Sequence, residues 1–130
     1  MAFLSWHDRY QLGHAELDAQ HRKLFELVNH FEDVVQMDMS VELGRIMEDI
    51  ITCAIDHFEF EEALMEQVRF PGLLEHRRMH EDLIRQIQLM ADRMKAGGHL
   101  SSRSVIRFLV DWLTNHLMRE DMALKPYLGR

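Results

Sequence analysis

The stretch "HFEFEEALMEQVRFPGLLEHRRMH", residues 57–80, decides the fold, because it sets histidines and carboxylates at helical spacing among apolar side chains. His57 precedes Glu61 by four residues, and His76 precedes His80 by four. Residues four apart share one face of an α-helix, so each pair lies on one face. Charged helix faces usually point to solvent. Whether these two faces point to solvent or inward depends on where the apolar residues of the same helices lie.

Outside this stretch, apolar residues recur every three or four positions in four segments, which is typical of amphipathic helices. Ser40 is a suitable N-cap for the second helix, and Gly97 is a suitable cap at the end of the third. Pro71 and Gly72 predict the turn between the second and third helices. The predicted helices cover residues 18–35, 40–65, 73–94 and, starting at Ser101 or Ser102, a segment that ends near 120.

Short connections between helices of similar length favour antiparallel neighbours. We therefore predict an all-α fold, an antiparallel up-down-up-down four-helix bundle. An irregular N-terminal arm over residues 1–17 and a short C-terminal turn over residues 121–130 complete the expected single domain, residues 1–130. A chain of 130 residues with 47% hydrophobic residues is long enough for one core.

Composition excludes several classes of protein. The net charge of −7 and the absence of a basic run argue against binding to nucleic acid. No apolar stretch reaches the roughly 20 residues that span a bilayer, so we expect no membrane insertion. The lone Cys53 excludes an internal disulfide, and the first residues lack the pattern of a secretory signal, so we expect a cytoplasmic protein. We also expect a monomer, since no exposed apolar stripe is evident.

Extending each apolar stripe by steps of three and four reaches polar residues on the inner face of all four helices. Asp121 follows His116 by five residues, about 140° round an ideal helix, so it borders the inner face. Glu59 and Glu62 fall off the stripe, and we expect them to be solvated. The polar residues on the inner faces are His21, His57, Glu61, His76, His80 and His116.

A single histidine on an apolar face is more often a hydrogen-bonded core residue than a metal ligand, and His57 with Glu61 could be an ordinary surface pair. His7, His14, His30 and His99 have no partner at ligand spacing, so the ordinary interpretation holds for them. Burying five imidazoles and a carboxylate together without partners would cost free energy for each group. The joint pattern therefore predicts a metal site.

The donors indicate which metals fit. Seven donors exceed the four ligands of a structural zinc ion, and the lack of thiolates leaves iron, manganese or zinc as candidates. If Glu61 and Asp121 each bridge two six-coordinate ions, five histidines and a bridging oxygen leave one position open. That position would accept one small exogenous ligand.

The inner-face residues lie in four motifs, which are "LDAQHRKLFELVNHF" (17–31), "HFEFEEALM" (57–65), "FPGLLEHRRMH" (70–80) and "DWLTNHLMRED" (111–121). In this order along the chain, the motifs resemble the hemerythrin family and most closely its single-domain bacterial members, the bacteriohemerythrins. The departures are small, with Phe70 where tyrosine is common in the family and Met122 where lysine is common.

The resemblance implies a non-haem di-iron centre with a bridging oxo or hydroxo group and reversible binding of dioxygen. It assigns Glu61 and Asp121 as ligands that bridge the two irons. It implies that dioxygen binds to the iron that has two histidines. By the same resemblance, one iron is held by His76, His80 and His116, and the other by His21 and His57.

We expect an apolar wall around the dioxygen position, and ordinary core packing is the alternative role for the same residues. The leading hypothesis is transport, storage or local supply of dioxygen, with an oxygen-consuming enzyme as a candidate partner. The alternatives are dioxygen or redox sensing, a di-iron oxidase or peroxidase, and iron storage. The residues expected in the wall are Leu24, Phe25, Trp112 and Leu113.

Overall fold

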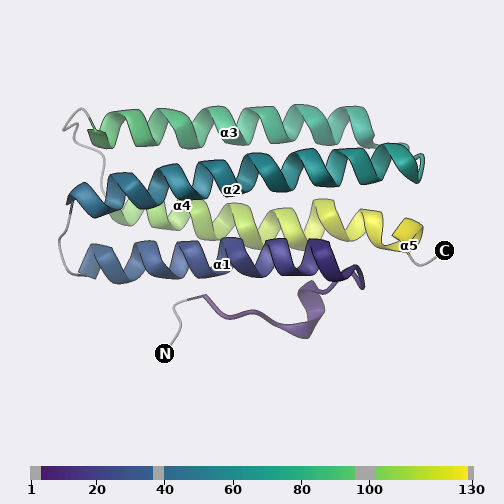
Figure 1. Ribbon diagram of the computed structural model, residues 1–130, viewed down its shortest axis with the longest axis horizontal. Helices are drawn as coiled ribbons and strands as arrows, with labels where there is room; N and C mark the ends of the chain where they lie inside the picture. The colour runs from purple at the N-terminus through teal and green to yellow at the C-terminus, as the bar shows by residue number, and fades with distance from the viewer. Residues whose placement is uncertain (1–3, 37–39, 96–101, 129–130) are drawn as a thin grey trace.

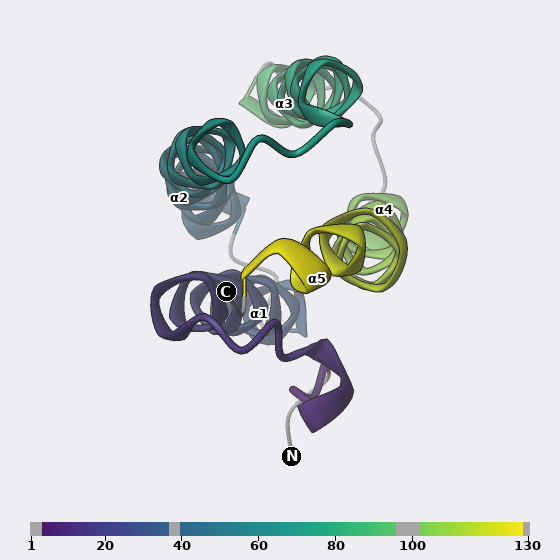
Figure 2. The same cartoon turned by 90° about the vertical axis from the view of Figure 1, so that its right-hand side faces the viewer.

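The computed structural model describes residues 4–36, 40–95 and 102–128, and this part of the chain is helical with no strand. Its four long helices lie side by side, and each runs opposite to the one before it (Figures 1 and 2). The predicted all-α four-helix bundle is confirmed. The helices are α1 (Ala15–Gln36), α2 (Ser40–Gln67), α3 (Leu73–Lys95) and α4 (Ser102–Asn115).

Helix α1 begins three residues before the predicted start, so the N-terminal arm is shorter than the predicted residues 1–17. The backbone N–H of Leu17 donates to Nδ1 of His14 at 3.3 Å, which satisfies one of the free donors of the first turn. The arm contains a short 3-10 helix, η1 (Asp8–Tyr10), and is tied to α1 where the N–H of Leu12 donates to Oδ1 of Asp18 at 2.8 Å.

The fourth helix does not run as a regular α-helix to residue 120, as predicted. It ends at Asn115 and passes into a π-helix, η2 (His116–Glu120). The predicted C-terminal turn is a 3-10 helix, η3 (Asp121–Leu124), followed by the short α5 (Lys125–Leu128). Pro126 lies in the first turn of α5, where a missing N–H is tolerated. The predicted cap at Gly97 and the alternative start at Ser101 lie outside the described residues.

The apolar core consists of two clusters separated along the bundle. The larger contains Val28, Ile50 and Leu109 and reaches Phe58, while the smaller contains Leu12, Leu17, Met65 and Leu124. On each helix, the buried polar residues fall in sequence between members of these two clusters or their apolar neighbours. A polar layer therefore interrupts the core.

The N-terminal arm packs along α1. The Trp6 ring lies 5.3 Å from the Phe25 ring and 5.5 Å from the Tyr10 ring. Asn29 holds the start of the described arm in both directions, since its Oδ1 accepts the N–H of Leu4 at 2.6 Å and its Nδ2 donates to the Leu4 carbonyl at 2.8 Å. These two bonds satisfy both backbone polar groups of Leu4 and fasten the arm to α1.

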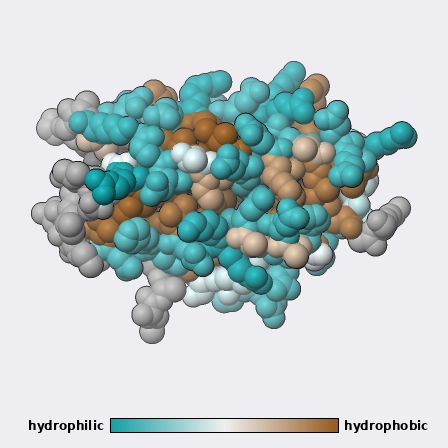
Figure 3. Space-filling view, viewed as in Figure 1, coloured by the Kyte–Doolittle hydropathy of each residue, from teal (hydrophilic) through white to brown (hydrophobic). Residues whose placement is uncertain are grey.

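The face shown in Figure 3 exposes apolar side chains between rows of hydrophilic ones. Leu74 and Leu89, both on α3, are the most exposed large apolar side chains in the part of the chain that the structure describes. No helix among the described residues is long and apolar enough to cross a membrane.

Replacing Asn29 with alanine should lower the free energy of unfolding by about 1–3 kcal/mol, because two hydrogen bonds to Leu4 are lost together. Urea unfolding of the metal-free protein would show this as a lower midpoint with an unchanged slope. Gln88→Ala is the control, since it removes one exposed hydrogen bond, to Asp92. Equal midpoints for the two variants would contradict the role of Asn29.

Candidate metal centre

The seven side chains that the sequence singles out lie together inside the bundle. Helices α1, α2 and α3 each supply at least one of them, and η2 and η3, which continue the chain beyond α4, supply the other two. All are at most 4% exposed, and the two carboxylates, Glu61 and Asp121, are fully buried. The seven are His21 from α1, His57 and Glu61 from α2, His76 and His80 from α3, His116 from η2, and Asp121 from η3.

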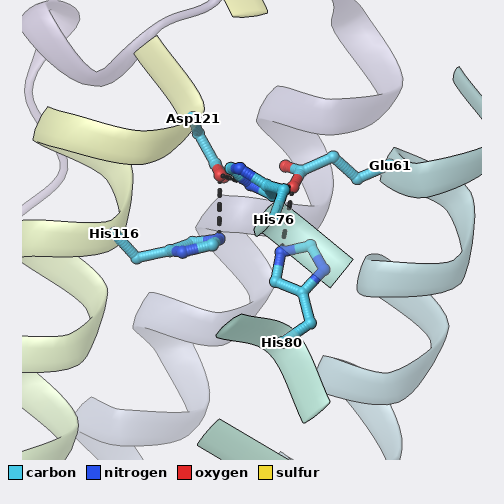
Figure 4. Close-up of side chains that lie close together, drawn as sticks. All are labelled: Glu61, His76, His80, His116 and Asp121. Carbon is cyan, nitrogen blue, oxygen red and sulfur yellow. Dashed lines mark hydrogen bonds and ion pairs between the residues drawn. The ribbon is translucent and has the colours of Figure 1, made fainter. Parts of the chain in front are cut away.

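The donor atoms form two groups that share both carboxylates. Within each group, all donor atoms lie within 4.8 Å of one another. Figure 4 shows the larger group, in which His116 and His80 approach Asp121 and Glu61 from different helices. Two clusters joined by two carboxylates are the arrangement expected of a site for two metal ions with bridging carboxylates. The larger group is Glu61, His76, His80, His116 and Asp121, and the smaller is His21, His57, Glu61 and Asp121.

The ring nitrogens point at the same small volume. Nε2 of His76 lies 2.9 Å from Oε1 of Glu61 and 3.1 Å from Oδ1 of Asp121. Nε2 of His21 lies 2.8 Å from Oδ2 of Asp121 and only 3.0 Å from Nε2 of His57. Two imidazole nitrogens that face each other can share only one proton, so at least one lone pair is directed into the cluster.

The π-helix explains how Asp121 reaches a face that it was predicted only to border. The backbone N–H of Asp121 donates to the carbonyl of His116, five residues earlier, as a π-turn requires. A turn of this kind holds more residues than an α-turn, so side chains five apart come nearer to one face. His116 Nε2 and Asp121 Oδ1 accordingly lie 2.8 Å apart. Such single π-turns occur often at functional sites.

Two residues outside the cluster orient two of its histidines. Nδ1 of His57 lies 2.8 Å from Oε1 of Gln20, and Nδ1 of His80 lies 2.8 Å from Oε2 of Glu62. These oxygens accept, so each Nδ1 donates and each Nε2 is the nitrogen that faces the cluster, where it becomes a metal ligand once it carries no proton. Arg77 in turn donates to Glu62 through Nε at 2.9 Å.

The prediction that Glu62 is solvated is therefore wrong. Its side chain is 18% exposed and bonded on both oxygens, whereas Glu59 is exposed as predicted. Gln20 and Phe58 were also missed, and the Phe58 ring stacks on His80 at 3.8 Å with an interplanar angle of 4°. The available signal was proximity in sequence, since Gln20, Glu62 and Phe58 each adjoin a residue of the cluster.

Mutual contact keeps the carboxylates ionised despite their burial. Burial and the charge of Asp121 act to raise the pKa of Glu61, but hydrogen bonds from histidines of the cluster outweigh them and lower it to about 2. Burial also acts to raise the pKa of Asp121, but the charge and hydrogen bond of His116 and the bond from His21 hold it well below its ordinary value. Both groups are thus acceptors at neutral pH.

The pKa values of three histidines of the cluster are shifted, two of them upward and one downward. Burial acts to lower the pKa of His57 and of His76, but hydrogen bonds to Asp121 and Glu61 outweigh it and raise each value to about 9. For His21 burial prevails over the contact with Asp121 and lowers the pKa. In the metal-free protein, protons on His57 and His76 therefore balance the two buried carboxylates.

The cluster fits bound cations, because its own members cannot satisfy one another. In the described residues, several buried polar atoms of the cluster have no hydrogen-bond partner. Nε2 of His116, although close to Asp121, is among them. Imidazole and carboxylate donors without thiolate suit iron, manganese or zinc. The other such atoms are Nδ1 of His21 and His116, Oε2 of Glu61, Nε2 of His80 and Oδ2 of Asp121.

All four residues expected in an apolar wall are buried in the larger apolar cluster. The Trp112 ring lies 6.3 Å from the ring of His116, one of the histidines of the cluster. Their place in the core agrees equally with ordinary packing, so their role around dioxygen stays a prediction. The four are Leu24, Phe25, Trp112 and Leu113.

Comparisons with known proteins agree with this geometry. The family model described as "Hemerythrin HHE cation binding domain" matches residues 12–128. A protein named Bacteriohemerythrin from Stenotrophomonas maltophilia is 34% identical over 124 residues, which cover 95% of this chain and 80% of that protein. One of the same name from Pseudomonas aeruginosa is 31% identical over 121 residues, covering 93% and 78%.

Solved structures agree on the fold. A crystal structure of wild-type hemerythrin matches with a TM-score of 0.92 at 25% identity, covering 99% of this chain and all of that one. The bundle and its buried cluster define the class: four-helix proteins with a cation-binding site built from histidines and carboxylates. The chain belongs to the hemerythrin family, as its motifs indicated.

Loading the metal-free protein with a divalent ion at about pH 7 should release protons, because ligation requires neutral imidazoles and the pKa values of His57 and His76 are raised to about 9. The release should fall as the pH rises through about 9, where both groups are already deprotonated. Calorimetric titration in two buffers of different ionisation enthalpy measures it. The exposed His30→Ala variant should behave as the unchanged protein does, and a release independent of pH would contradict this account.

Replacing Glu62 with glutamine keeps an acceptor for His80 but removes its charge. Metal affinity should fall about 10- to 100-fold, because an anionic partner makes the imidazole a stronger donor. Competition with a chelator of known affinity measures the change. Glu59→Gln is the matched control on the exposed side of α2, and equal affinities for the two variants would refute the role of Glu62.

Proposed function

We propose that this protein binds dioxygen reversibly at a non-haem di-iron centre and serves in transport, storage or local supply of dioxygen. The observation that supports it best is the asymmetry of the cluster, in which one group has three histidines and the other has two around the same two carboxylates. Equal coordination of two ions would then leave a free position on the side with two histidines. A free position suits one small ligand.

The seven side chains have distinct roles in this proposal. Glu61 and Asp121 would bridge the irons, since each belongs to both groups of donors. A bridging oxo or hydroxo group would complete the pair, and iron bound there would supply the redox chemistry for dioxygen binding. One iron would be held by His76, His80 and His116, and the other by His21 and His57.

The protein around the centre favours binding over turnover. The larger apolar cluster on one side and the smaller one on the other limit the access of water and of larger substrates. Imidazole-rich coordination supplies less negative charge than the carboxylate-rich sites of ferritin-like proteins, so it should stabilise highly oxidised iron less. We therefore do not propose an enzymatic activity.

The names of the relatives support the same function, since several are called Bacteriohemerythrin. Cytoplasmic location, a monomeric state and supply to an oxygen-consuming enzyme remain predictions from the sequence.

Anaerobic reduction of the iron-loaded protein followed by titration with dioxygen tests the function. A visible charge-transfer band should saturate at one dioxygen per pair of irons and disappear under argon. Replacing His57 with alanine should abolish the reversible band, because it removes one of the two histidines beside the free position, while the exposed His30→Ala should retain it.

Other outcomes point to the alternative functions. Iron that oxidises without a reversible band, together with sustained turnover, would replace carriage with an oxidase or peroxidase activity. Iron content far above one pair per chain would indicate storage instead. A band that follows dioxygen only when a partner protein is present would favour sensing.

A further inference from the structure

The seam between α3 and α4 differs from the other seams of the bundle. Helices α3 and α4 stand apart, whereas α1 packs on α2 and on α4, and α2 packs on α3 (Figure 2). Two hollows of about 290 and 350 Å³ open along this seam. Met79 and Glu120 line both, so the hollows adjoin. We call this pair of hollows the α3–α4 vestibule.

The vestibule leads from exposed acids to buried histidines of the metal centre. Glu75 and Glu120, both exposed, line the larger hollow, and no described residue forms an ion pair with either. His76 lines the same hollow and His116 lines the other, and each is only 4% exposed. Asp111 and Arg119 also line the smaller hollow, so carboxylates outnumber cationic side chains along a path that ends at metal-binding side chains.

His116 independently indicates a ligand at the inner end. Its Nδ1 has no hydrogen-bond partner among the described residues, although the side chain is buried and faces the smaller hollow, and its Nε2 has a carboxylate oxygen of Asp121 at 2.8 Å. A buried ring nitrogen without a partner costs free energy, and a cation arriving through the vestibule would reduce that cost.

The seam between α2 and α3 also has a hollow, of about 270 Å³, with acids at its rim and His80 at its base. This hollow is closed to a cation by contacts already made. The Phe58 ring covers His80 at 3.8 Å, and Nδ1 of His80 is bonded to Glu62, which is itself paired with Arg77.

We propose that the α3–α4 vestibule is the route by which divalent metal ions enter the centre. Glu75 and Glu120 act as the first, temporary ligands, and His76 and His116 receive the ion. This rests on the metal centre of the proposed function but not on dioxygen binding. A route residue changes the rates of entry and exit, whereas a ligand of the final site changes the affinity.

The test uses uptake of Co²⁺ by the metal-free full chain, followed by the rise in visible absorbance after rapid mixing under argon at low ionic strength. The double variant Glu75→Gln/Glu120→Gln should take up Co²⁺ about 10-fold more slowly or worse, because acids at a cleft concentrate cations locally. The final Co²⁺ content per chain should not change. The difference should shrink in high salt.

Glu26→Gln/Asp33→Asn is the matched control. It also removes two negative charges, but from exposed positions on α1, a helix that does not line the α3–α4 vestibule. Its uptake should stay near that of the unchanged protein. Equal slowing of the two double variants would mean that overall charge acts, and unchanged uptake by both would mean that ions enter elsewhere. Either result overturns the route.

Met79→Trp provides a second test at the point where the hollows adjoin. A bulkier side chain there should slow both the uptake of Co²⁺ and its removal by a chelator, at unchanged final content. Unchanged rates in this variant would overturn the route. If the unchanged protein takes up no Co²⁺ at all, the metal centre and the route both fail, whereas normal uptake without dioxygen binding would refute only the proposed function.

Discussion

The structure depends on one constraint, the burial of five imidazoles and two carboxylates in a single layer of a small bundle. Such groups can leave water only if they satisfy one another or a bound ion. In the metal-free protein they do so incompletely, with protons shared between Glu61, Asp121 and two histidines and with several donor atoms left unpaired. The two apolar clusters on either side hold the layer in place, and their burial offsets the free-energy cost of burying the polar groups.

The two halves of the polar layer hold unequal numbers of histidines, and this inequality suits the layer to binding a small ligand. Three histidines face one side of the shared carboxylates and two face the other. The supporting residues differ as well, since a carboxylate, Glu62, orients His80 and a neutral amide, Gln20, orients His57. A charged partner strengthens its imidazole more than an amide does, so the two metal positions should differ in electron density as well as in ligand number.

The same layer must remain reachable by ions without admitting water freely. In the hollow between α2 and α3, Phe58 stacks on His80, and Glu62 is bonded to His80 and Arg77. The seam between α3 and α4 is the most widely spaced and holds two adjoining hollows (Figure 2). Acids at its mouth and histidines at its base give that seam a polarity suited to cations. Leu24 and Leu113 lie in the larger apolar cluster, where ordinary core packing and exclusion of water require the same side chains.

The sequence by itself determined the four helices, the inward direction of six of the seven polar residues and the family, because helical period and motif spacing are local properties of the chain. It placed Asp121 only at the border of the inner face and Glu62 in solvent. Tertiary structure decided both: the π-turn after Asn115 rotates Asp121 inward, and Glu62 finds its partners on α3, a different helix. The hollow seam could not be predicted either, since the spacing of two helices depends on how all their side chains pack, and no local pattern records it.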